Sequence, residues 1–410
     1  MKVLQVNITG KSGSTGKITN AIRMYLLCQG HESIVAYSVD NVSDKGYFKL
    51  SKRWELAVAL RMVRFGRAAY KGNPFAFRRL KTVIESEHPD IVHLHCINCN
   101  CVNIYKLLDY LAHNHYPTVV THHAEFFYTG ACPHAFVCTK YIDQQCIGCN
   151  NEHYATSNRL WANPHKCWER MQKAFSQFER DKLIFVSVSP WVEKRSLKSP
   201  IVNSYPCITV YNGVDISVFS FKSVSDGLKK KVFGDVRNLV LHVSANFNPL
   251  DKTNLKGGYY VVEIAKRMPH CRFLVVASVA NNINSLPDNV HFWGRASSQS
   301  ELSSLYNLAT VTLLTSREET FSMVTAESLC CGTPVVGFRA GGPESIAIKK
   351  YSSFVEYGDI EALHHELCNF LSFNFDKERV SNESKVVYSK ETMGAGYLKV
   401  YQRLLKRGES

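Results

Sequence analysis

The stretch TSREETFSMVTAESLCCGTPVVGFRAGG covers Thr315–Gly342 and carries two glutamates, Glu319 and Glu327, eight positions apart. Eight residues span slightly more than two helical turns. A helix that begins near Phe321 therefore contains Glu327 and leaves Glu319 just before its first turn. Both carboxylates can then face one cleft and accept hydrogen bonds from sugar hydroxyls. The alternative is that both are ordinary acids on a helix surface.

Both ends of this predicted helix carry their own signals. At the N-terminal end, the backbone N–H groups of Thr320, Phe321 and Ser322 are expected to be uncapped donors available to a diphosphate. At the other end, Gly332 and Pro334 close the helix and begin the next strand. The stretch therefore predicts an anion site at the start of a helix, followed by a strand.

Short runs rich in Val, Ile and Leu recur along the whole chain, with helical segments between them. They read VLQVNI, SIVAYSV, DIVHLH, TVVTHH, LIFVSVS and ITVYNG in the first half, and LVLHVSA, RFLVVAS, VHFWG, ATVTLLTS and TPVVGF in the second. Such runs are typical of strands buried on both faces of a parallel sheet. We predict an α/β protein of two doubly wound, Rossmann-like domains, with ligands at the carboxyl ends of the strands and in the cleft between the domains.

The chain of 410 residues is long enough for two domain cores. A polar, basic stretch, FKSVSDGLKKK at Phe221–Lys231, is the expected connector. We therefore expect an N-terminal domain over residues 1–220 and a C-terminal domain over residues 225–390. The last helical segment, residues 392–410, is able to pack back on the first domain.

The stretch Thr315–Gly342 resembles a motif of the retaining glycosyltransferases of family 4, which have the GT-B fold of two Rossmann-like domains. The family frame is Ser-x-x-Glu-x-Phe-x-x-Val-x-x-Glu-x-x-x-x-Gly-x-Pro-Val-Val. The residues that fit it are Ser316, Glu319, Phe321, Val324, Glu327, Gly332, Pro334, Val335 and Val336. The resemblance extends to VSVSPWV at Val186–Val192 and YNGVD at Tyr211–Asp215. Within the family, the chain looks most like members of colanic acid and capsular polysaccharide biosynthesis.

The resemblance implies roles for the acidic pair and for one lysine. Glu319 is expected near the hydroxyls of the donor sugar, as a catalytic residue, and Glu327 on the nucleotide ribose. Family members also hold the donor diphosphate with an arginine and a lysine, and Lys256, which precedes Gly257, matches the lysine. The C-terminal domain is thus the expected nucleotide-sugar-binding domain.

The arginine of that basic pair is missing, because its position falls in the stretch Val243–Asn246, which reads VSAN. Lys252 or Arg295 could substitute for it, although each could equally be a solvated surface cation. A charged hydrogen bond in a closed cleft contributes about 1.5–3 kcal/mol. The loss of one leaves open a weaker site, a changed donor, or a protein that binds nucleotide sugars without catalysis.

The N-terminal glycine turn, GKSGSTGKIT at Gly10–Thr19, does not have the spacing of a Walker A loop. Lys11 stands where the first glycine is required, and Ile18 stands where a hydroxyl would reach magnesium. The family resemblance implies instead that this turn faces the donor. The residues expected to bind the sugar nucleotide are Gly13, Ser14, Thr15 and Gly16. The alternative is a tight turn that needs glycine for its backbone alone.

His123 ends the strand TVVTHH and matches a Thr-x-His of the family on the acceptor side of the cleft. A histidine there can hydrogen-bond sugar hydroxyls or a phosphate, and its pKa suits proton exchange, so we expect a catalytic role. His122 is expected to point into packing on the opposite face. His93 and His95 also end a strand but are not assigned to the ligand. The resemblance implies no covalent nucleophile, because the departing phosphate assists the acceptor hydroxyl.

Four cysteines, Cys132, Cys138, Cys146 and Cys149, lie in CPHAFVCTKYIDQQCIGC. Four thiolates at such spacing can make a tetrahedral structural zinc site that ties down a loop with too little apolar content to fold alone. His134 is an alternative ligand. The other interpretation is a set of free thiols in a cysteine-rich chain. No cofactor is expected to be required for catalysis.

The formal charge of +14 favours a polyanionic neighbour, which could be nucleic acid, an acidic lipid surface or a phosphorylated substrate. Residues 52–81 contain nine Lys or Arg and one acid. On a helix, one stripe of this segment collects Trp54, Val58, Met62, Phe65 and Ala69. Such a helix can lie on an anionic membrane. The alternative is a helix packed on its own domain with a solvated basic face.

No apolar run is long enough to span a membrane, and Met1 begins directly on a strand-like segment, so we expect a cytoplasmic protein, at the inner face of the membrane. The leading interpretation is a glycosyltransferase that moves a hexose, with retention, from a nucleotide-diphosphate sugar to a lipid-linked oligosaccharide of a surface polysaccharide. The alternatives are a catalytically impaired nucleotide-sugar-binding protein and a basic zinc-knuckle protein that binds nucleic acid. The last leaves the acidic frame unexplained, and nucleic acid is not the expected partner.

Overall fold

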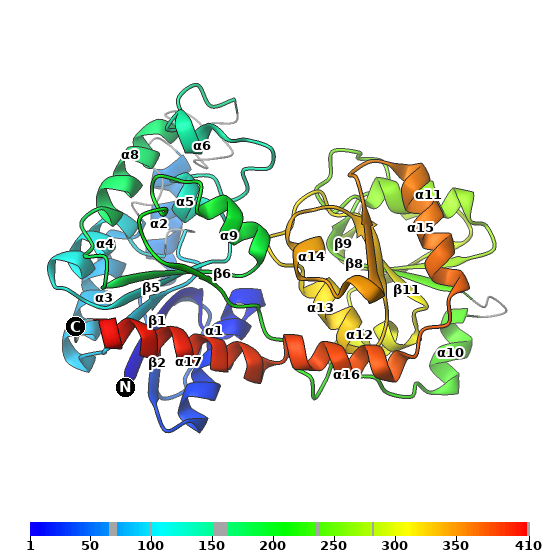
Figure 1. Ribbon diagram of the computed structural model, residues 1–410, viewed down its shortest axis with the longest axis horizontal. Coiled ribbons are helices and arrows are strands. Elements are labelled where there is room, and N and C mark those ends of the chain that lie inside the picture. The colour runs from blue at the N-terminus through cyan, green and yellow to red at the C-terminus, as the bar shows by residue number, and fades with distance from the viewer. Residues whose placement is uncertain (65–71, 99–100, 151–162, 234–237, 281–282, 408–410) are drawn as a thin grey trace. The chain divides into compact units, whose positions relative to one another are not determined.

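The computed structural model divides by its internal contacts into two compact units (Figure 1). The structure describes residues 1–64, 72–98, 101–150, 163–233, 238–280 and 283–407. The first unit consists of Met1–Tyr211 and Met393–Ser410, and the second of Asn212–Thr392. Each unit is built on a parallel sheet, so the predicted α/β class with two doubly wound domains is confirmed.

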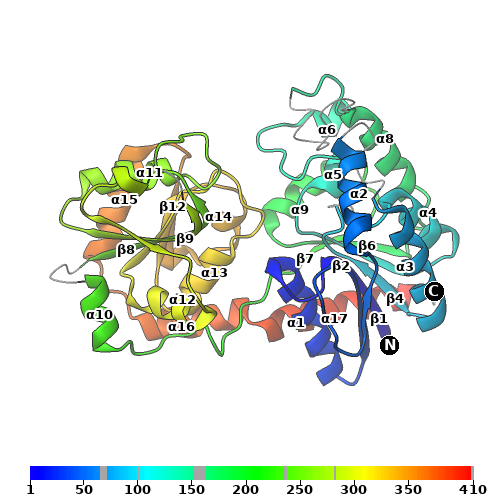
Figure 2. The ribbon, with the colours of Figure 1, turned by 180° about the vertical axis from the view of Figure 1, so that it is seen from behind.

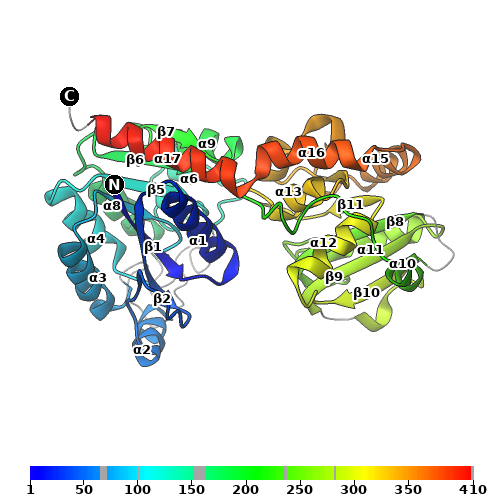
Figure 3. The same cartoon turned by 90° about the horizontal axis from the view of Figure 1, so that it is seen from below.

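The sheet of the first unit has the strand order β3-β2-β1-β4-β5-β6-β7 in the described part of the chain. Its strands are β1 (Lys2–Thr9), β2 (Glu32–Val39), β3 (Tyr47–Lys49), β4 (Ile91–Leu94), β5 (Thr118–His122), β6 (Leu183–Ser187) and β7 (Cys207–Thr209). Its helices are α1 (Gly13–Cys28), α2 (Arg53–Arg64), α3 (Pro74–Glu87), α4 (Ile104–His113), α5 (Phe126–Thr129), α6 (Lys140–Asp143), α8 (Pro164–Phe175), α9 (Pro190–Ser196) and α17 (Lys390–Arg407). Figure 3 shows α1 on one side of β1, with α3 and α4 on the other.

Alternate side chains of the strands bury themselves against different helices, as the two-residue period of a strand requires. On one face, Val3, Ile91 and Val119 pack with Ile22 of α1 and Tyr397 of α17, in a single apolar cluster. On the other face, Phe185 of β6 meets Phe175 of α8, with 5.1 Å between the ring centroids. The last helix of the chain therefore completes the core of the first unit.

Three helices of the first unit begin with the same local chemistry. Asn73, Asn163 and Ser189 each precede a proline and use the side-chain oxygen to accept a backbone N–H of the first turn. Such a residue satisfies a donor that the helix leaves open, and proline fits the first helical position because its missing N–H is not needed there. The sequence thus fixes these helix starts locally.

The sheet of the second unit has the order β10-β9-β8-β11-β12-β13 in the residues that the structure describes. Its strands are β8 (Leu239–Phe247), β9 (Arg272–Ala280), β10 (Val290–Gly294), β11 (Val311–Leu314), β12 (Val335–Phe338) and β13 (Ser352–Val355). Its helices are α10 (Asp226–Phe233), α11 (Gly258–Arg267), η1 (Ile283–Ser285), α12 (Gln299–Leu308), α13 (Met323–Cys330), α14 (Gly342–Ile346), η2 (Lys349–Tyr351), α15 (Ile360–Ser372) and α16 (Lys377–Tyr388). Figure 2 shows α11 and α15 together on one side of this sheet, with α12 and α13 on the other.

The expected connector belongs to the second unit. The backbone N–H of Phe221 donates to Ser381 Oγ at 3.0 Å, and that of Lys222 donates to Asn307 Oδ1 at 2.8 Å. The division that the contacts draw lies earlier, between Tyr211 and Asn212. A polar, basic composition is typical of an exposed linker, but hydrogen bonds to side chains of α16 and α12 hold the start of this segment in place.

Each sheet has a point where the strand order reverses, between β1 and β4 in the first unit and between β8 and β11 in the second. In doubly wound folds the connections that leave neighbouring strands at such a point go to opposite faces of the sheet, and ligands bind there beyond the carboxyl ends of the strands. The segments at these points are the turn after β1 and the segment from Thr315 to Glu319 after β11. These are the segments that the sequence singled out.

Candidate active site

Glu319 follows β11 and is held by backbone pairing on both sides. Its N–H donates to Ala340 O at 2.9 Å, and its carbonyl accepts the N–H of Gly342 at 2.8 Å. A Cβ at Gly342 would stand 2.5 Å from the carbonyl carbon of Thr320, so only glycine allows the two loops to approach this closely. This backbone pairing fixes the position of the Glu319 Cα at the carboxyl end of the sheet.

Lys256 meets the carboxylate of Glu319, with 2.5 Å between Nζ and Oε1. Gly257 makes this meeting possible. It has a left-handed φ of +68°, and a Cβ there would lie 2.1 Å from Thr315 O. Thr315 also donates its hydroxyl to Lys256 O at 3.0 Å. The structure therefore brings together two residues that the sequence predicted for the donor, from loops 63 residues apart.

The start of α13 differs from the prediction. The helix begins at Met323, and Ser322 is its N-cap, with its Oγ accepting the N–H of Thr325 at 3.3 Å. Thr320, Phe321 and Ser322 therefore precede the helix instead of forming an uncapped first turn. Serine is a strong N-cap, and this preference decides where the helix starts. Phe321 is buried, and its side chain belongs to the core.

Glu327 lies inside α13, as predicted, and is half-buried. Its Oε2 accepts the hydroxyl of the buried Tyr306 of α12, at 3.4 Å. Glu344 takes a place that the sequence did not predict: its carboxylate accepts the N–H groups of Ala340 and Gly341 at 3.0 and 2.8 Å. Glu344 thereby orders the loop that pairs with Glu319, and a glutamate at the third position of a helix is the signal for such a cap.

The other two candidate cations are exposed side chains. Lys252 is exposed and stands over the ring of Tyr259, with 5.8 Å from Nζ to the centroid. Arg295 is exposed after β10. Asn246, which belongs to the stretch where the arginine is missing, is exposed near the end of β8. Of these residues, Lys256 is the one whose contact with Glu319 the structure shows.

The glycine turn of the first unit is anchored by a residue that the sequence did not reveal. The carboxylate of Asp40 accepts the backbone N–H groups of Gly10, Lys11 and Ser12 at 3.0–3.2 Å, and the Ser12 hydroxyl at 2.6 Å. Burial raises the pKa of Asp40, but these hydrogen bonds outweigh it and hold the pKa below its usual value. The backbone donors before α1 are thus already occupied by a carboxylate.

Gly13, Ser14, Thr15 and Gly16 form the first turn of α1. Gly13 has a left-handed φ of +68°. A Cβ at Gly16 would stand 2.7 Å from Thr9 Oγ1 and 2.9 Å from the carbonyl carbon of Lys11. The two glycines therefore meet backbone requirements, and binding of the sugar nucleotide by this turn stays a prediction.

A chain of hydrogen bonds from Gln5 through His95 orients the ring of His123. The Nε2 of Gln5 donates to Thr19 O at 3.2 Å and to Ser33 Oγ at 3.1 Å. A backbone carbonyl only accepts, so the amide turns its Oε1 toward Nε2 of His95, 3.1 Å away. Nε2 of His95 thus carries the proton, and its Nδ1 accepts from Nε2 of His123 at 3.0 Å. The neutral ring of His123 therefore bears its lone pair on Nδ1.

The neighbouring histidine ties this chain to the last helix. His93 Nδ1 lies 2.7 Å from the hydroxyl of Tyr401, and its Nε2 lies 2.8 Å from Thr121 Oγ1. Thr121 in turn lies 3.2 Å from the hydroxyl of Tyr397. His93, His95, Thr121 and His123 share one face of the sheet, because they follow the two-residue period of β4 and β5.

Burial lowers the pKa of every histidine in this group. The pKa of His123 falls to about 4. The pKa values of His93 and His95 lie well below the usual value, through burial first and then through the neighbouring histidines. The rings are therefore neutral at physiological pH, which the tautomer argument requires. His122 faces the opposite side and packs its ring against Phe185, with 5.1 Å between centroids, as predicted.

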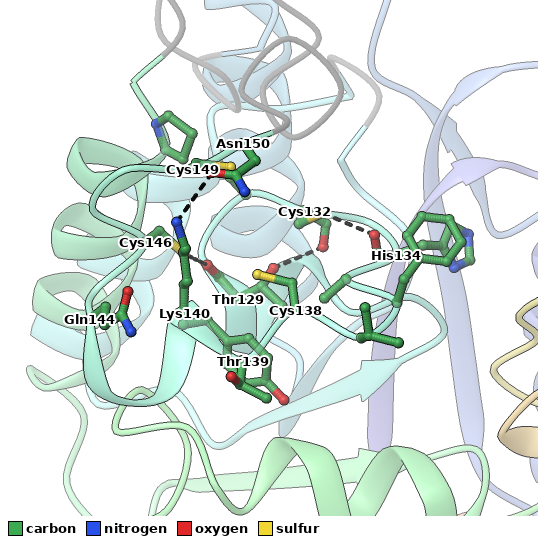
Figure 4. A pocket seen from close by; sticks show the side chains of 16 residues that line it. Thr129, Cys132, His134, Cys138, Thr139, Lys140, Gln144, Cys146, Cys149 and Asn150 are labelled. Carbon is green, nitrogen blue, oxygen red and sulfur yellow. Dashed lines mark hydrogen bonds between the residues drawn. The ribbon is translucent and has the colours of Figure 1, made fainter.

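The four predicted metal ligands, Cys132, Cys138, Cys146 and Cys149, line one pocket of about 430 Å³ in the first unit (Figure 4). His134 lines the same pocket. None of the four cysteines forms a disulfide in the structure. The structure thus gathers these side chains around one space.

The fold and these residues define the class of the protein. Two doubly wound units, each with its candidate residues at the carboxyl ends of a parallel sheet, are the architecture of the GT-B fold. Solved structures support this along nearly the whole chain. Sucrose-phosphate synthase from Thermosynechococcus elongatus matches with a TM-score of 0.69 and 14% identity, over 99% of each chain. The Anabaena protein HepE in complex with UDP matches with a TM-score of 0.66 and 13% identity, over 98% of this chain and 100% of that one.

Two family models match this sequence. "Glycosyltransferase Family 4" matches residues 21–218, and "Glycosyl transferases group 1" matches residues 248–372. The chain is therefore a glycosyltransferase of the GT4 type. A curated relative, the N-acetyl-alpha-D-glucosaminyl L-malate synthase of Bacillus anthracis, is 26% identical over 159 residues, which are 37% of this chain and 40% of the relative. The match thus spans less than half of that relative's length.

Proposed function

We propose that the chain transfers a hexose, with retention, from a nucleotide-diphosphate sugar to a lipid-linked oligosaccharide in the synthesis of a surface polysaccharide of the colanic acid or capsular type. GT4 membership supports the transfer of a sugar. HepE has been solved with UDP and with UDP-glucose, which supports a uridine nucleotide as the first donor to test. The acceptor and the pathway rest on the sequence resemblance.

The observation that carries the proposal is the contact between Lys256 and Glu319. An ammonium and a carboxylate at the carboxyl end of the sheet offer one group for a diphosphate and one for sugar hydroxyls. The two side chains are 28% and 22% exposed, so a ligand can reach both. Glu327, one turn into α13, is the proposed partner of the ribose. The diphosphate would compete with Glu319 for Lys256 and release the carboxylate to the sugar.

In the proposed reaction, the bond from the anomeric carbon of the donor sugar to the diphosphate oxygen breaks. A bond from the same carbon to the acceptor oxygen forms on the same face, and the proton of the acceptor hydroxyl passes to the departing phosphate. Lys256 stabilises the charge that develops on the diphosphate. His123 is proposed to hold sugar hydroxyls through its ring, oriented by His95 and Gln5.

A lipid-linked acceptor fits the surface of α2. The helix turns Glu55 and Ala59 inward and leaves Trp54 and Val58 exposed, at 56% and 45% of their surface. The exposed apolar stripe is flanked by the exposed Arg53 and Arg61. Such a face suits an anionic membrane. We propose that this face makes a peripheral contact with the inner face of the membrane. No helix among the described residues combines the length and the apolar character needed to cross a membrane.

The donor site is tested by thermal unfolding of the purified chain with UDP, GDP, ADP and their sugar conjugates. A ligand at about 100 times its Kd stabilises the folded state by about 2.7 kcal/mol. We expect a clear rise in Tm with one nucleotide, which Lys256→Ala and Glu327→Ala abolish.

Lys266→Ala serves as the matched control, because Lys266 forms its ion pair with Glu263 on the surface of α11, away from the acidic pair. This variant should respond to the nucleotide like the wild type. Absence of a shift with every nucleotide would overturn the donor site as assigned. A shift without any turnover of the sugar conjugate would favour a nucleotide-sugar-binding protein that has lost catalysis.

A further inference from the structure

We propose that the pocket formed by Cys132, Cys138, Cys146 and Cys149 is a structural zinc site that holds the segment from Gly130 to Asn150 in place. None of the residues that line this pocket is among those assigned to the donor. Three features of the segment support this zinc site: the cysteines gather around one pocket, few side chains of the segment are buried, and its backbone adopts positive φ angles near the cysteines.

The four cysteines come together although they are spread over 18 residues of irregular chain. All four contribute to the lining of one pocket, and Figure 4 shows their side chains around the same space. The sulfur of Cys132 is 3.0 Å from His134 O, and that of Cys146 is 3.5 Å from Thr129 O. In the described part of this unit, no three of these sulfurs lie within 4.8 Å of one another. A Zn–S bond of about 2.3 Å therefore requires the side chains to turn toward a common centre on binding.

The segment has too little core to explain its order. Of residues 131–150, only Ala131, Ala135 and Tyr141 are buried, while Val137 and Ile147 are 90% and 57% exposed. The single helix in the segment is α6, with four residues. Fixing the backbone costs about 1–2 kcal/mol per residue. Three buried side chains, two of them alanine, offset only a small part of that cost for so long a segment. Hydrogen bonds to Tyr141 O and from Ala135 N–H anchor two points of the segment, and a metal cross-link would stabilise the rest.

The backbone around the cysteines is in a conformation that side chains disfavour. Phe136, Gln145 and Cys146 have positive φ values of 50°, 49° and 59°. Such residues cost of order 1 kcal/mol or more each and persist where the surroundings over-determine them. Gly148, at φ 61°, lies between Cys146 and Cys149 and lets the chain turn between these two cysteines.

The chemistry of the donor set selects the ion. Four cysteine sulfurs are soft ligands that suit Zn²⁺ in tetrahedral geometry, whereas Mg²⁺ and Ca²⁺ take oxygen ligands. Four protein ligands leave no open position for substrate, so the role is structural. The alternative states of these four cysteines are two disulfides or four thiols without metal, and these are the other outcomes of the test.

The test measures zinc in the full-length chain, purified with a non-thiol reductant and without chelator, by plasma mass spectrometry. We expect about one zinc per chain, and a loss of about tenfold or more in Cys146→Ser/Cys149→Ser. The matched control is Cys28→Ser/Cys368→Ser, which changes two cysteines outside the pocket and should keep the zinc. Full zinc in the pocket variant, or none in the wild type even after incubation with zinc, would overturn the proposal.

A second measurement does not depend on the folding of any variant. Cobalt added to the metal-free wild type should give the intense thiolate-to-metal absorption and the visible bands of a tetrahedral sulfur site. A count of reactive thiols in denaturant that falls four short of the 14 cysteines would show disulfides instead. Zinc content is measured apart from nucleotide binding, so failure here leaves the donor site unaffected.

Discussion

At the scale of the residue, the first unit concentrates neutral histidines around the carboxyl ends of β4 and β5. Burial lowers the pKa of four histidines there, His93, His95, His122 and His123. The chain from Gln5 through His95 selects one tautomer of His123, because the amide of Gln5 can accept only with its oxygen. Burial of these histidines therefore has two consequences. It keeps the rings neutral in a defined hydrogen-bonding pattern, and it makes the free energy of unfolding depend on pH.

The sign of that dependence follows from the histidine pKa values. Each histidine has a folded pKa below its unfolded value of 6.5, so the unfolded state binds more protons as the pH falls below 6.5. The free energy of unfolding of the first unit should therefore decrease between pH 6.5 and about 4. The slope is about 1.4 kcal/mol per pH unit for each proton taken up. Urea unfolding at a series of pH values measures it.

His122→Phe should reduce the slope of the free energy of unfolding against pH by the contribution of one proton. The ring of His122 packs among aromatic neighbours, including Phe185 and Tyr128, so phenylalanine suits its surroundings. Its pKa of about 3 makes it the clearest member of the group to replace. His365→Gln, at a side chain that is 73% exposed, is the control and should leave the slope unchanged. An unchanged slope in His122→Phe would contradict the assignment of these protons to the buried histidines.

At the scale of the element, the candidate donor site is made where loops touch, and glycines set the distance. Gly257 and Gly342 let the loop before α11 and the loop before α14 approach the segment after β11. Lys256 lies on the loop before α11, and Glu319 lies on the segment after β11. The position of the pair thus depends on the backbone of its neighbours as much as on its own side chains.

Gly257→Ala should therefore separate Lys256 from Glu319. The added Cβ would meet Thr315 O at 2.1 Å, and the left-handed φ of +68° is strained for alanine. We expect the stability of the second unit to fall by about 1–3 kcal/mol. The Kd for the nucleotide identified by thermal unfolding should rise about tenfold or more, measured by calorimetry on folded protein.

The same substitution at Gly227 is the matched control. Gly227 lies in α10, and a Cβ there meets no atom within 4 Å. Alanine in a helix is more stable than glycine by about 0.5–1 kcal/mol, so Gly227→Ala should keep or raise the stability and leave the nucleotide affinity alone. A wild-type affinity in Gly257→Ala would show that the spacing of the two loops does not matter for the ligand.

At the scale of the whole molecule, the chain returns to its first unit after completing its second. From Met393 onward, α17 packs in the core with Val3, Ile22 and Val119, and its Tyr401 reaches His93. Charge is also a property at this scale, and +14 over the chain favours an anionic surface. The exposed stripe of α2 is where charge and apolar surface coincide. Phe65 and Ala69, predicted on the same stripe, lie outside the described residues.

The proposed membrane contact predicts co-sedimentation with vesicles that contain phosphatidylglycerol, and little with phosphatidylcholine alone. Arg53→Ala and Arg61→Ala should each weaken the binding about fivefold, because a basic residue near an anionic surface is worth about 1 kcal/mol. Trp54→Ala should weaken it further, at an unchanged salt dependence. Phe373→Ala, which removes a 63% exposed aromatic side chain from the second unit, is the control. Equal binding to both vesicle types would exclude this surface as the membrane contact.

The sequence by itself determined the fold class and most of the strands, because runs of Val, Ile and Leu and the acidic frame are local signals. It missed β3 and β13, whose three or four residues include no long apolar run. It also placed the start of α13 before its serine cap. These errors belong to short elements and helix ends, where a few hydrogen bonds decide the outcome.

Only the tertiary structure decided which side chains meet. Asp40 anchors a turn 28–30 residues away, Gln5 reaches His95 across 90 residues, and Lys256 reaches Glu319 across 63. Such contacts depend on strand register and on close approach at glycines, which a local pattern does not encode. The four cysteines were visible as a motif, but their gathering around one pocket follows from the path of an irregular segment. The sequence thus names the candidate groups, and packing brings them within bonding distance.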